Sequence, residues 1–125
     1  MRLLLDTHIV LWMMLDAPEL KAAARRWIGA AESLHVSTVS LWELAIKRDI
    51  GKLQIDADAF DAHLLASGVQ PLAIDWEHAR RYRALPRLHR DPFDRMLVAQ
   101  AIAEPMHLLT RDATLAQYSD LVICA

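Results

Sequence analysis

Short apolar runs alternate along the chain with longer segments in which apolar residues recur at helical spacing. A short continuous apolar run is typical of a strand buried on both faces, and apolar residues three and four positions apart are typical of an amphipathic helix. The expected strands cover residues 2–5, 34–37, 69–74, 107–110 and 121–123. Pro71 restricts the third strand to a short one or an edge one, because proline cannot donate to a central ladder.

Helical spacing fills the intervals between these runs. The expected helices cover residues 7–15, 18–29, 38–50, 56–66, 76–85, 91–102 and 113–118. Strands that alternate with helices indicate a parallel sheet with helices on both faces. We therefore predict an α/β fold, a three-layer α/β/α sandwich with a central, mainly parallel sheet. Because only 3 Gly and 5 Pro are spread along the chain, we find no linker and expect a single domain over residues 1–125.

The composition narrows the class of protein. A hydrophobic content of 54% is too high for a disordered chain, and a net charge of −2 excludes a wholly basic protein that coats nucleic acid. The single cysteine, Cys124, cannot form an internal disulfide, so a reducing cytoplasm is the expected compartment. Asp6 and His8 interrupt the apolar residues near the start well short of the roughly 18 that a membrane span needs, so no membrane partner is expected.

Four acidic residues are placed to meet at one edge of the predicted sheet. Asp6 and Asp112 follow apolar strands, and Glu43 and Asp94 lie near the starts of helices. Sites in such folds form outside the carboxyl ends of the strands. Clustered carboxylates repel one another unless a cation neutralises them, and hard oxygen ligands suit Mg²⁺ or Mn²⁺. Such an ion activates a bound water and stabilises charge on a phosphodiester.

Each of these acids also has a purely structural interpretation. Asp6 and Asp112 could cap the helices that follow them, and Asp94 lies in a first turn, where the helix dipole favours any acid. Glu43 could form an ordinary pair with Lys47, worth about 0.2–0.5 kcal/mol. Periodicity alone does not choose between the two interpretations.

The acids come with recognisable neighbours in four segments. These are Leu4-Leu5-Asp6-Thr7-His8, Val36-Ser37-Thr38-Val39-Ser40-Leu41-Trp42-Glu43, His89-Arg90-Asp91-Pro92-Phe93-Asp94-Arg95-Met96-Leu97-Val98-Ala99-Gln100-Ala101 and Leu108-Leu109-Thr110-Arg111-Asp112. In this order and over the full chain, they closely resemble the PIN-domain ribonucleases, specifically the VapC-like toxins of bacterial toxin–antitoxin pairs. The resemblance implies a PIN-like fold and a metal-dependent endoribonuclease that cleaves RNA with metal-activated water.

The resemblance also assigns roles to single residues and names partners. The acids that would bind Mg²⁺, or Mn²⁺ in its place, are Asp6, Glu43 and Asp94 at the centre and Asp112 as the fourth. The supporting residues are Thr7 and Thr110, which would hold the acids or a bound water, and Asp91, which is either at the rim of the site or only a helix cap. Toxins of this type are held inactive by a cognate antitoxin, and their subunits pair as homodimers.

Positive charge is concentrated just before and within the third of these segments. Residues 80–95 contain six arginines and two aspartates, a local net charge of +4 in a chain that is negative overall. The candidates for contact with RNA phosphates are Arg87, Arg90, Arg95 and Arg111. The alternative is a solvated helix face whose arginines pair with acids such as Glu77. His8 and His89 lie beside motif acids, but a lone histidine is more often structural, so neither is assigned to the metal site.

Aromatic and methionine residues are interpreted first as core. This applies to Trp42 and Trp76, and to the first-helix residues Trp12, Met13 and Met14. For the first-helix residues the alternative is a hydrophobic groove that accepts an antitoxin helix.

Three other function classes fit the sequence less well than a ribonuclease does. A phospho-acceptor receiver needs paired acids after its first strand and a late lysine, whereas Asp6 stands alone and no lysine follows Lys52. A catalytically silent PIN-like RNA-binding or regulatory module has no need of all four acids. A DNA or flap nuclease of the same architecture needs insertions that a chain of 125 residues has little room for.

Overall fold

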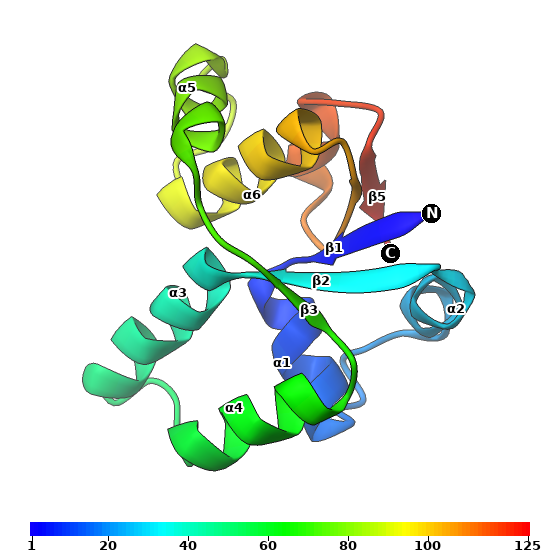
Figure 1. The fold of residues 1–125 in the computed structure, drawn as a ribbon, viewed down its shortest axis with the longest axis vertical. Coiled ribbons are helices and arrows are strands. Elements are labelled where there is room, and N and C mark those ends of the chain that lie inside the picture. The colour runs from blue at the N-terminus through cyan, green and yellow to red at the C-terminus, as the bar shows by residue number, and fades with distance from the viewer.

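The computed structural model describes residues 1–125 and contains one sheet of five strands, all parallel. The strands are β1 (Arg2–Leu5), β2 (Ser33–Ser37), β3 (Gln70–Leu72), β4 (His107–Thr110) and β5 (Val122–Cys124). Their order across the sheet is β3-β2-β1-β4-β5 (Figure 1). The strand that begins the chain therefore lies at the centre of the sheet, with later strands added on both sides of it.

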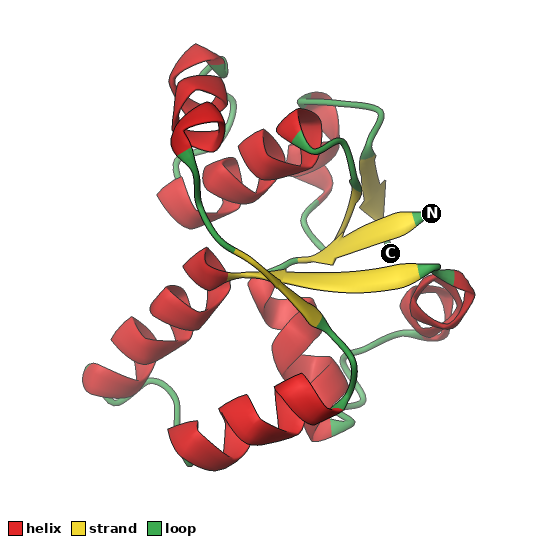
Figure 2. Cartoon of the chain, in the orientation of Figure 1, coloured by secondary structure: helices red, strands yellow, loops and turns green.

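Helices cover both faces of this sheet, as Figure 2 shows. They are α1 (Thr7–Leu15), α2 (Ala22–Ala30), α3 (Thr38–Asp49), α4 (Ala57–Ala66), α5 (Trp76–Ala84), α6 (Pro92–Ala103) and the short 3₁₀ helix η1 (Ala113–Gln117). The predicted α/β/α sandwich is thus confirmed. None of these helices is long and apolar enough to cross a membrane.

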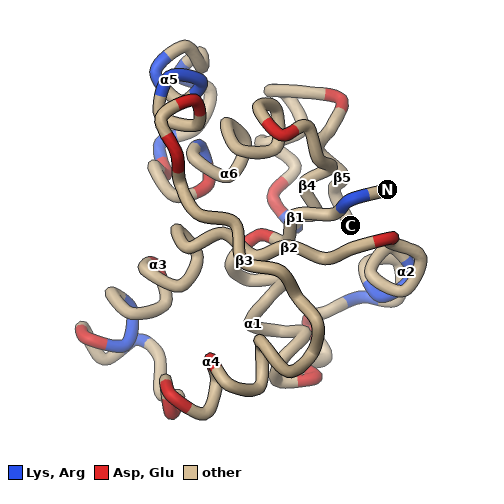
Figure 3. Tube along the Cα trace, viewed as in Figure 1, with Lys and Arg blue, Asp and Glu red and all other residues tan.

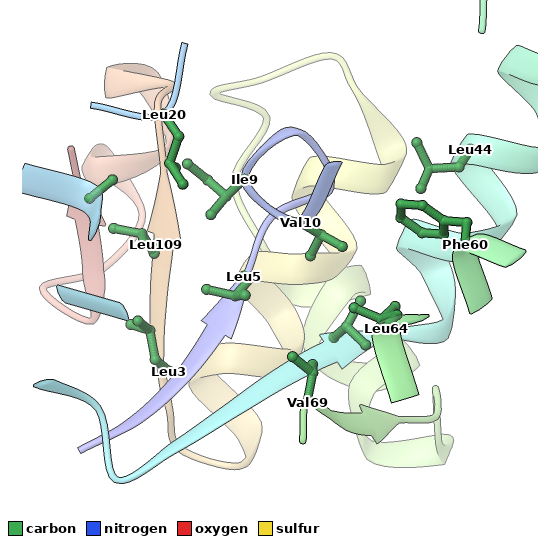
Figure 4. Close-up of a cluster of buried hydrophobic side chains, with 12 residues drawn as sticks. Leu3, Leu5, Ile9, Val10, Leu20, Leu44, Phe60, Leu64, Val69 and Leu109 are labelled. Carbon is green, nitrogen blue, oxygen red and sulfur yellow. The ribbon is translucent and has the colours of Figure 1, made fainter. Parts of the chain in front are cut away.

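Two hydrophobic clusters, one on each face, hold the layers together. Leu3 and Leu5 of β1 belong to the cluster under α1 to α4, which Figure 4 draws with Phe60 and Leu64 of α4. Leu4 belongs to the cluster under α6 and η1. All three leucines are fully buried, because side chains along a strand alternate between the two faces and both faces of this strand are covered. This explains why β1 reads as an unbroken apolar run.

Two details of the predicted elements are corrected. Helix α2 begins at Ala22 and not at Pro18, because the residues between form a turn in which Arg25 donates to the carbonyl oxygens of Ala17 and Leu20. Strand β3 is shorter than predicted, but it lies at the edge of the sheet, as its proline requires.

The prediction that Trp42 and Trp76 are core residues is wrong. Their exposed fractions are 60% and 82%. Trp42 packs edge-on against Phe93 of α6, with ring centroids 5.2 Å apart, and is otherwise open to solvent. Helical spacing identifies an apolar position, but it does not reveal whether another element covers that position.

The strand order places one edge of the sheet where a site can form. The chain moves from β1 through β2 to β3 on one side and returns to β4 and β5 on the other. The connection that follows β1 runs to β2 on one side, and the connection that follows β4 runs to β5 on the other side. Crevices in parallel sheets lie at such a reversal, here between β1 and β4, outside the carboxyl ends of the strands. The start of α6 reaches the same edge, because α6 leads back to the beginning of β4.

Candidate active site

Asp6 stands at the carboxyl end of β1 and is only 4% exposed. It caps α1, since its Oδ1 accepts from the backbone N–H of Ile9 at 2.9 Å. Its Oδ2 accepts from the hydroxyl of Thr110, and the same hydroxyl oxygen accepts from the backbone N–H of Asp112 at 3.0 Å. Thr110 therefore connects two of the acids, and burial raises the pKa of Asp6 despite these hydrogen bonds.

Glu43 reaches the site from the second turn of α3. One carboxylate oxygen, Oε2, lies 3.1 Å from Lys47 Nζ, whereas the other, Oε1, is buried without any hydrogen-bond partner. One turn earlier, Ser40 accepts a hydrogen bond from Thr7 Oγ1 at 2.9 Å, which fixes α3 against the start of α1. A buried oxygen without a donor is costly, and a cation beside Glu43 would satisfy it.

Asp94 lies in the first turn of α6, behind the helix cap Asp91. The Oδ1 atom of Asp91 accepts from the backbone N–H groups of Phe93 and Asp94, at 2.8 and 3.2 Å, so the cap interpretation of Asp91 is confirmed. Burial, together with the nearby charges of Asp91, Asp6 and Glu43, raises the pKa of Asp94 to about 7. The charges of both other central acids, Asp6 and Glu43, therefore act on the carboxylate of Asp94.

Asp112 is held from two sides at the end of β4. Its Oδ1 accepts from the backbone N–H of Thr114, which caps η1, and its Oδ2 lies 2.7 Å from His89 Nε2. Burial alone would raise the pKa of Asp112, but the hydrogen bonds from His89 and Thr114 lower it below its usual range. Atoms of His89, Asp94 and Asp112 all lie within 4.8 Å of one another.

The structure thus brings the four predicted acids to one edge of the sheet. Asp6 and Glu43 are buried, and Asp94 and Asp112 are partly exposed. A divalent cation suits this set, because its donors are carboxylate oxygens and because Glu43 Oε1 has no partner of its own. The capping and ion-pair interpretations also hold for Asp6, Asp112 and Glu43, so those contacts fix the acids without excluding a metal.

The predicted phosphate-binding arginines fall into two groups. Arg87 and Arg90 are exposed. Arg95 instead donates to Tyr82 Oη at 3.1 Å and to the Leu85 carbonyl at 3.3 Å, and its guanidinium lies over the Tyr82 ring. Arg95 therefore joins α6 to α5.

Two further arginine predictions can be compared with the structure. Arg111 donates to the Glu19 carbonyl at 2.8 Å, and its guanidinium carbon lies 5.6 Å from the centre of the Trp12 ring. On α5, whose charges Figure 3 colours, Arg80 and Arg81 pair with Glu77 at 3.3 and 3.4 Å. The alternative of a salt-bridged, solvated helix face is confirmed for these two residues.

Helix α1 presents Trp12, Met13 and Met14 as half-buried side chains that pack against the larger hydrophobic cluster. Met14 and Leu15 also line an open groove of about 320 Å³, together with Phe60 and His63 of α4. The core interpretation therefore holds in part for all three residues, whereas only Met14 of the three lines this groove.

Sequence reasoning missed the contribution of His89 and Ser40. His89 was assigned no role because a lone histidine carries little information, and its contact with Asp112 joins residues far apart in the chain. Ser40 has no role assigned to it from the sequence, because a hydroxyl near the start of a helix is usually a cap, and here Ser37 is the residue that caps α3. Motif proximity is the signal that could have pointed to His89, which lies two positions before the cap of α6.

The raised pKa of Asp94 predicts how stability depends on pH. The folded protein binds the Asp94 proton more tightly than the unfolded chain, so the metal-free protein loses free energy of unfolding as pH rises from about 4 to about 7. Asp94→Asn removes this loss. We expect the variant to match the wild type near pH 4 and to exceed it by about 1–2 kcal/mol at pH 8, after allowing for solvent screening.

Urea unfolding of both proteins in EDTA at pH 4, 6 and 8 measures this difference. Asp120→Asn, at an exposed aspartate, is the control and should give no trend with pH. A stability difference for Asp94→Asn that is the same at all three pH values would contradict the prediction.

Comparison with known proteins places these features in one family. The sequence profile of the PIN domain matches residues 3–121. Ribonuclease VapC22 of Mycobacterium tuberculosis is 31% identical over 117 residues, which are 92% of this chain and 90% of that protein.

Solved structures with the same fold include proteins from two toxin–antitoxin complexes. A chain of VapBC2 from Rickettsia felis, bound to a DNA fragment from its promoter, superimposes with a TM-score of 0.72 at 17% identity. The superposition covers 100% of this chain and 98% of the Rickettsia felis chain. A toxin–antitoxin complex from Klebsiella pneumoniae gives a TM-score of 0.69 at 18% identity, covering 96% and 94%. The resemblance seen in the four sequence segments is confirmed, and the chain belongs to the PIN-domain family, within its VapC-like branch.

Proposed function

We propose that this protein is a metal-dependent endoribonuclease, the toxin of a type II toxin–antitoxin pair that acts in the cytoplasm. The observation that carries the proposal is the convergence of Asp6, Glu43 and Asp94 at one sheet edge, where a buried oxygen of Glu43 has no donor. The 31% identity to a ribonuclease over nearly the whole chain supports the reaction class. The exposed, unpaired Cys124 fits a reducing compartment.

In this proposal Asp6, Glu43 and Asp94 hold Mg²⁺, for which Mn²⁺ can substitute, and Asp112 is the outlying fourth acid. When bound, such an ion lowers the pKa of a water molecule and stabilises the charge that develops on the RNA phosphodiester. The protein's own contribution is orientation. Thr110 holds Asp6, Lys47 holds one oxygen of Glu43, and the hydrogen-bonded pair of Thr7 and Ser40 fixes the helices that carry them.

Neutral substitution of the central acids tests the reaction. Asp6→Asn, Glu43→Gln and Asp94→Asn each remove a negative ligand, and each is expected to lower Mg²⁺-dependent cleavage of a single-stranded RNA by about 100-fold or more. Asp112→Asn is expected to lose less, because both of its oxygens already have protein donors. Cleavage is followed on a fluorophore-labelled RNA with Mg²⁺, with Mn²⁺ and with EDTA.

Asp120→Asn is again the matched control and should cleave like the wild type. Undiminished cleavage in excess EDTA would contradict the metal dependence. A Glu43→Gln variant that is fully active and only less stable would show that Glu43 has only a structural role, its ion pair with Lys47. If wild-type protein binds RNA but never cleaves it, the silent-module alternative is correct.

We further propose that Arg87 and Arg90 bind RNA phosphates. They are exposed beside the segment that carries Asp91 and Asp94, and each lost phosphate contact should lower the slope of log K against log salt by about one unit. The double variant Arg87→Ala/Arg90→Ala should therefore bind RNA more weakly and with a flatter salt dependence. Fluorescence anisotropy from 50 to 300 mM salt, roughly the range over which such slopes are resolved, measures this.

Two controls separate binding from folding. Arg26 lies on α2, at the start of β2 and away from the carboxyl ends of the strands where the acids lie (Figure 1). Arg26→Ala should leave the slope of log K against log salt unchanged. Arg95→Ala should mainly lower stability, since Arg95 is bonded to Tyr82 and Leu85. An unchanged slope of log K against log salt in the double variant would show that Arg87 and Arg90 do not bind RNA phosphates.

The proposed regulator is a cognate antitoxin that lays a helix in the groove beside α1 and brings a basic side chain to Asp6, Glu43 or Asp94. The groove between Met14, Leu15 and Phe60 offers apolar contacts, and the charge of the acids attracts a cation. Proteins of the same fold have been solved in toxin–antitoxin complexes, which supports a partner of this kind.

Trp12 is half-buried on α1, the helix that contributes Met14 and Leu15 to the groove, and we expect the antitoxin helix to contact it as well. Trp12→Ala should therefore weaken inhibition by the antitoxin more than it weakens RNA cleavage, by about 10-fold or more, because buried aromatic anchors dominate such interfaces. Inhibition curves with the antitoxin encoded beside this gene give the measurement, with Trp27→Ala on α2 as control. A complex in which the antitoxin contacts neither α1 nor the acids would contradict the proposed mode of antitoxin binding, but it would not contradict the proposed nuclease activity.

A homodimer is also proposed, because the exposed Trp42 and Ile74 line one apolar pocket together with Phe93 and Met96, and a contiguous exposed apolar surface commonly marks a protein interface. Light scattering that gives the mass of one chain at every concentration would contradict it.

A further inference from the structure

His89 stands between the two outer acids of the site. Its Nε2 lies 2.7 Å from Asp112 Oδ2 and 3.8 Å from Asp94 Oδ2, and its side chain is 18% exposed. A histidine in this place has two possible roles toward a metal centre. It can bind the ion through Nε2, or it can donate a hydrogen bond from Nε2 to an acid.

The other ring nitrogen decides between these roles. Nδ1 lies 3.0 Å from the backbone nitrogen of Asp91, whose N–H can only donate. Nδ1 must therefore be the acceptor, and the ring proton is on Nε2. A ring bound to metal through Nε2 would carry its proton on Nδ1, which would set two N–H groups against each other at this contact. His89 is accordingly a donor to Asp112 and not a ligand.

The backbone holds the ring in this place. The N–H groups of Leu88 and His89 both donate to the hydroxyl of Tyr118, at 3.1 and 3.0 Å. Tyr118 ends η1 and Asp112 begins it. The segment before α6 is therefore attached to both ends of η1, once through the Tyr118 hydroxyl and once through the His89 ring.

This arrangement ties the orientation of Asp112 to the start of α6. Thr114 fixes one oxygen of Asp112 and His89 fixes the other, while the N–H of Asp91, the cap of α6, fixes His89. We infer that His89 is a positioning residue for the proposed nuclease: its Nε2–H holds Asp112 at a set place relative to Asp94, and it does not bind the metal. The inference rests on the proposed function for its effect on cleavage.

Two substitutions test the contacts of the two His89 ring nitrogens separately. His89→Gln can supply an N–H near the position of Nε2, whereas His89→Asn supplies an oxygen near the position of Nδ1 and no donor for Asp112. We expect His89→Gln to keep kcat/KM for RNA within about threefold and His89→Asn to lose about tenfold or more, the range found when residues that orient metal ligands are changed. In an Asp112→Asn background, His89→Asn should cause no further loss, because the two residues act as a unit.

The opposite ranking, with His89→Asn active and His89→Gln impaired, would assign His89 to the loop contact with Asp91 and overturn the inference. Equal losses in both variants, or a loss from His89→Asn that persists in the Asp112→Asn background, would also overturn it.

A measurement on the wild-type protein tests the ring directly and needs no activity. Two-bond ¹H–¹⁵N correlation spectra report which histidine nitrogen carries the proton. We expect the Nε2–H form for His89 in EDTA and the same form after titration with Mg²⁺. A proton on Nδ1, or a change of tautomer on adding Mg²⁺, would overturn the inference. If the spectra agree with it while the protein cleaves no RNA, the proposed function fails and the placement of His89 stands.

Discussion

Buried carboxylates at the carboxyl ends of the strands determine which contacts the surrounding elements must supply. Asp6 and Glu43 are almost fully buried, and an ionised carboxylate in that position is unstable unless donors or cations surround it. Most of the acids have such a partner: the Thr110 hydroxyl for Asp6, Lys47 for one oxygen of Glu43, and His89 for Asp112. Lys47 lies one turn from Glu43 on the same helix, but Thr110 and His89 come from other parts of the chain than the acids that they contact. The strands and helices must therefore pack together before Asp6 and Asp112 have their partners.

Asp94 differs from the other acids because no donor is hydrogen-bonded to its carboxylate, and its charge is opposed by three neighbouring acids. The proton therefore remains on Asp94 up to a pH of about 7. Asp112, with two donors, stays ionised to lower pH than usual. The site thus contains one acid that is protonated up to about pH 7 and one that remains an anion, and the difference arises from burial, hydrogen bonding and the neighbouring charges.

Much of the fold follows from local patterns in the sequence. Continuous apolar runs located the strands, and the acids after β1 and β4 could be placed at one edge because parallel strands end together. Contacts between distant residues could not be predicted in this way. Helical spacing gave no sign that Trp42 lacks a covering element, and a run of similar arginines did not distinguish Arg95, which faces Tyr82, from the exposed Arg90.

The raised pKa of Asp94 likewise depends on Asp6 and Glu43, which reach it from other elements of the fold. The contact between His89 and Asp112 joins the segment before α6 to the turn after β4. No periodicity encodes such pairings, because they are fixed by how the layers pack and not by the spacing of residues along one element.

The central position of β1 has a consequence for the order of events during synthesis. β1 pairs with β4, and Asp6 is bonded both to Leu109 and to Thr110, more than a hundred positions later in the chain. A ribosome releases the first strand long before the fourth, so a growing chain holds Asp6 without the residues that fix it. The complete set of acids comes together only after Asp112 has been synthesised and β4 can pair with β1, so a shorter nascent chain does not yet have the assembled site.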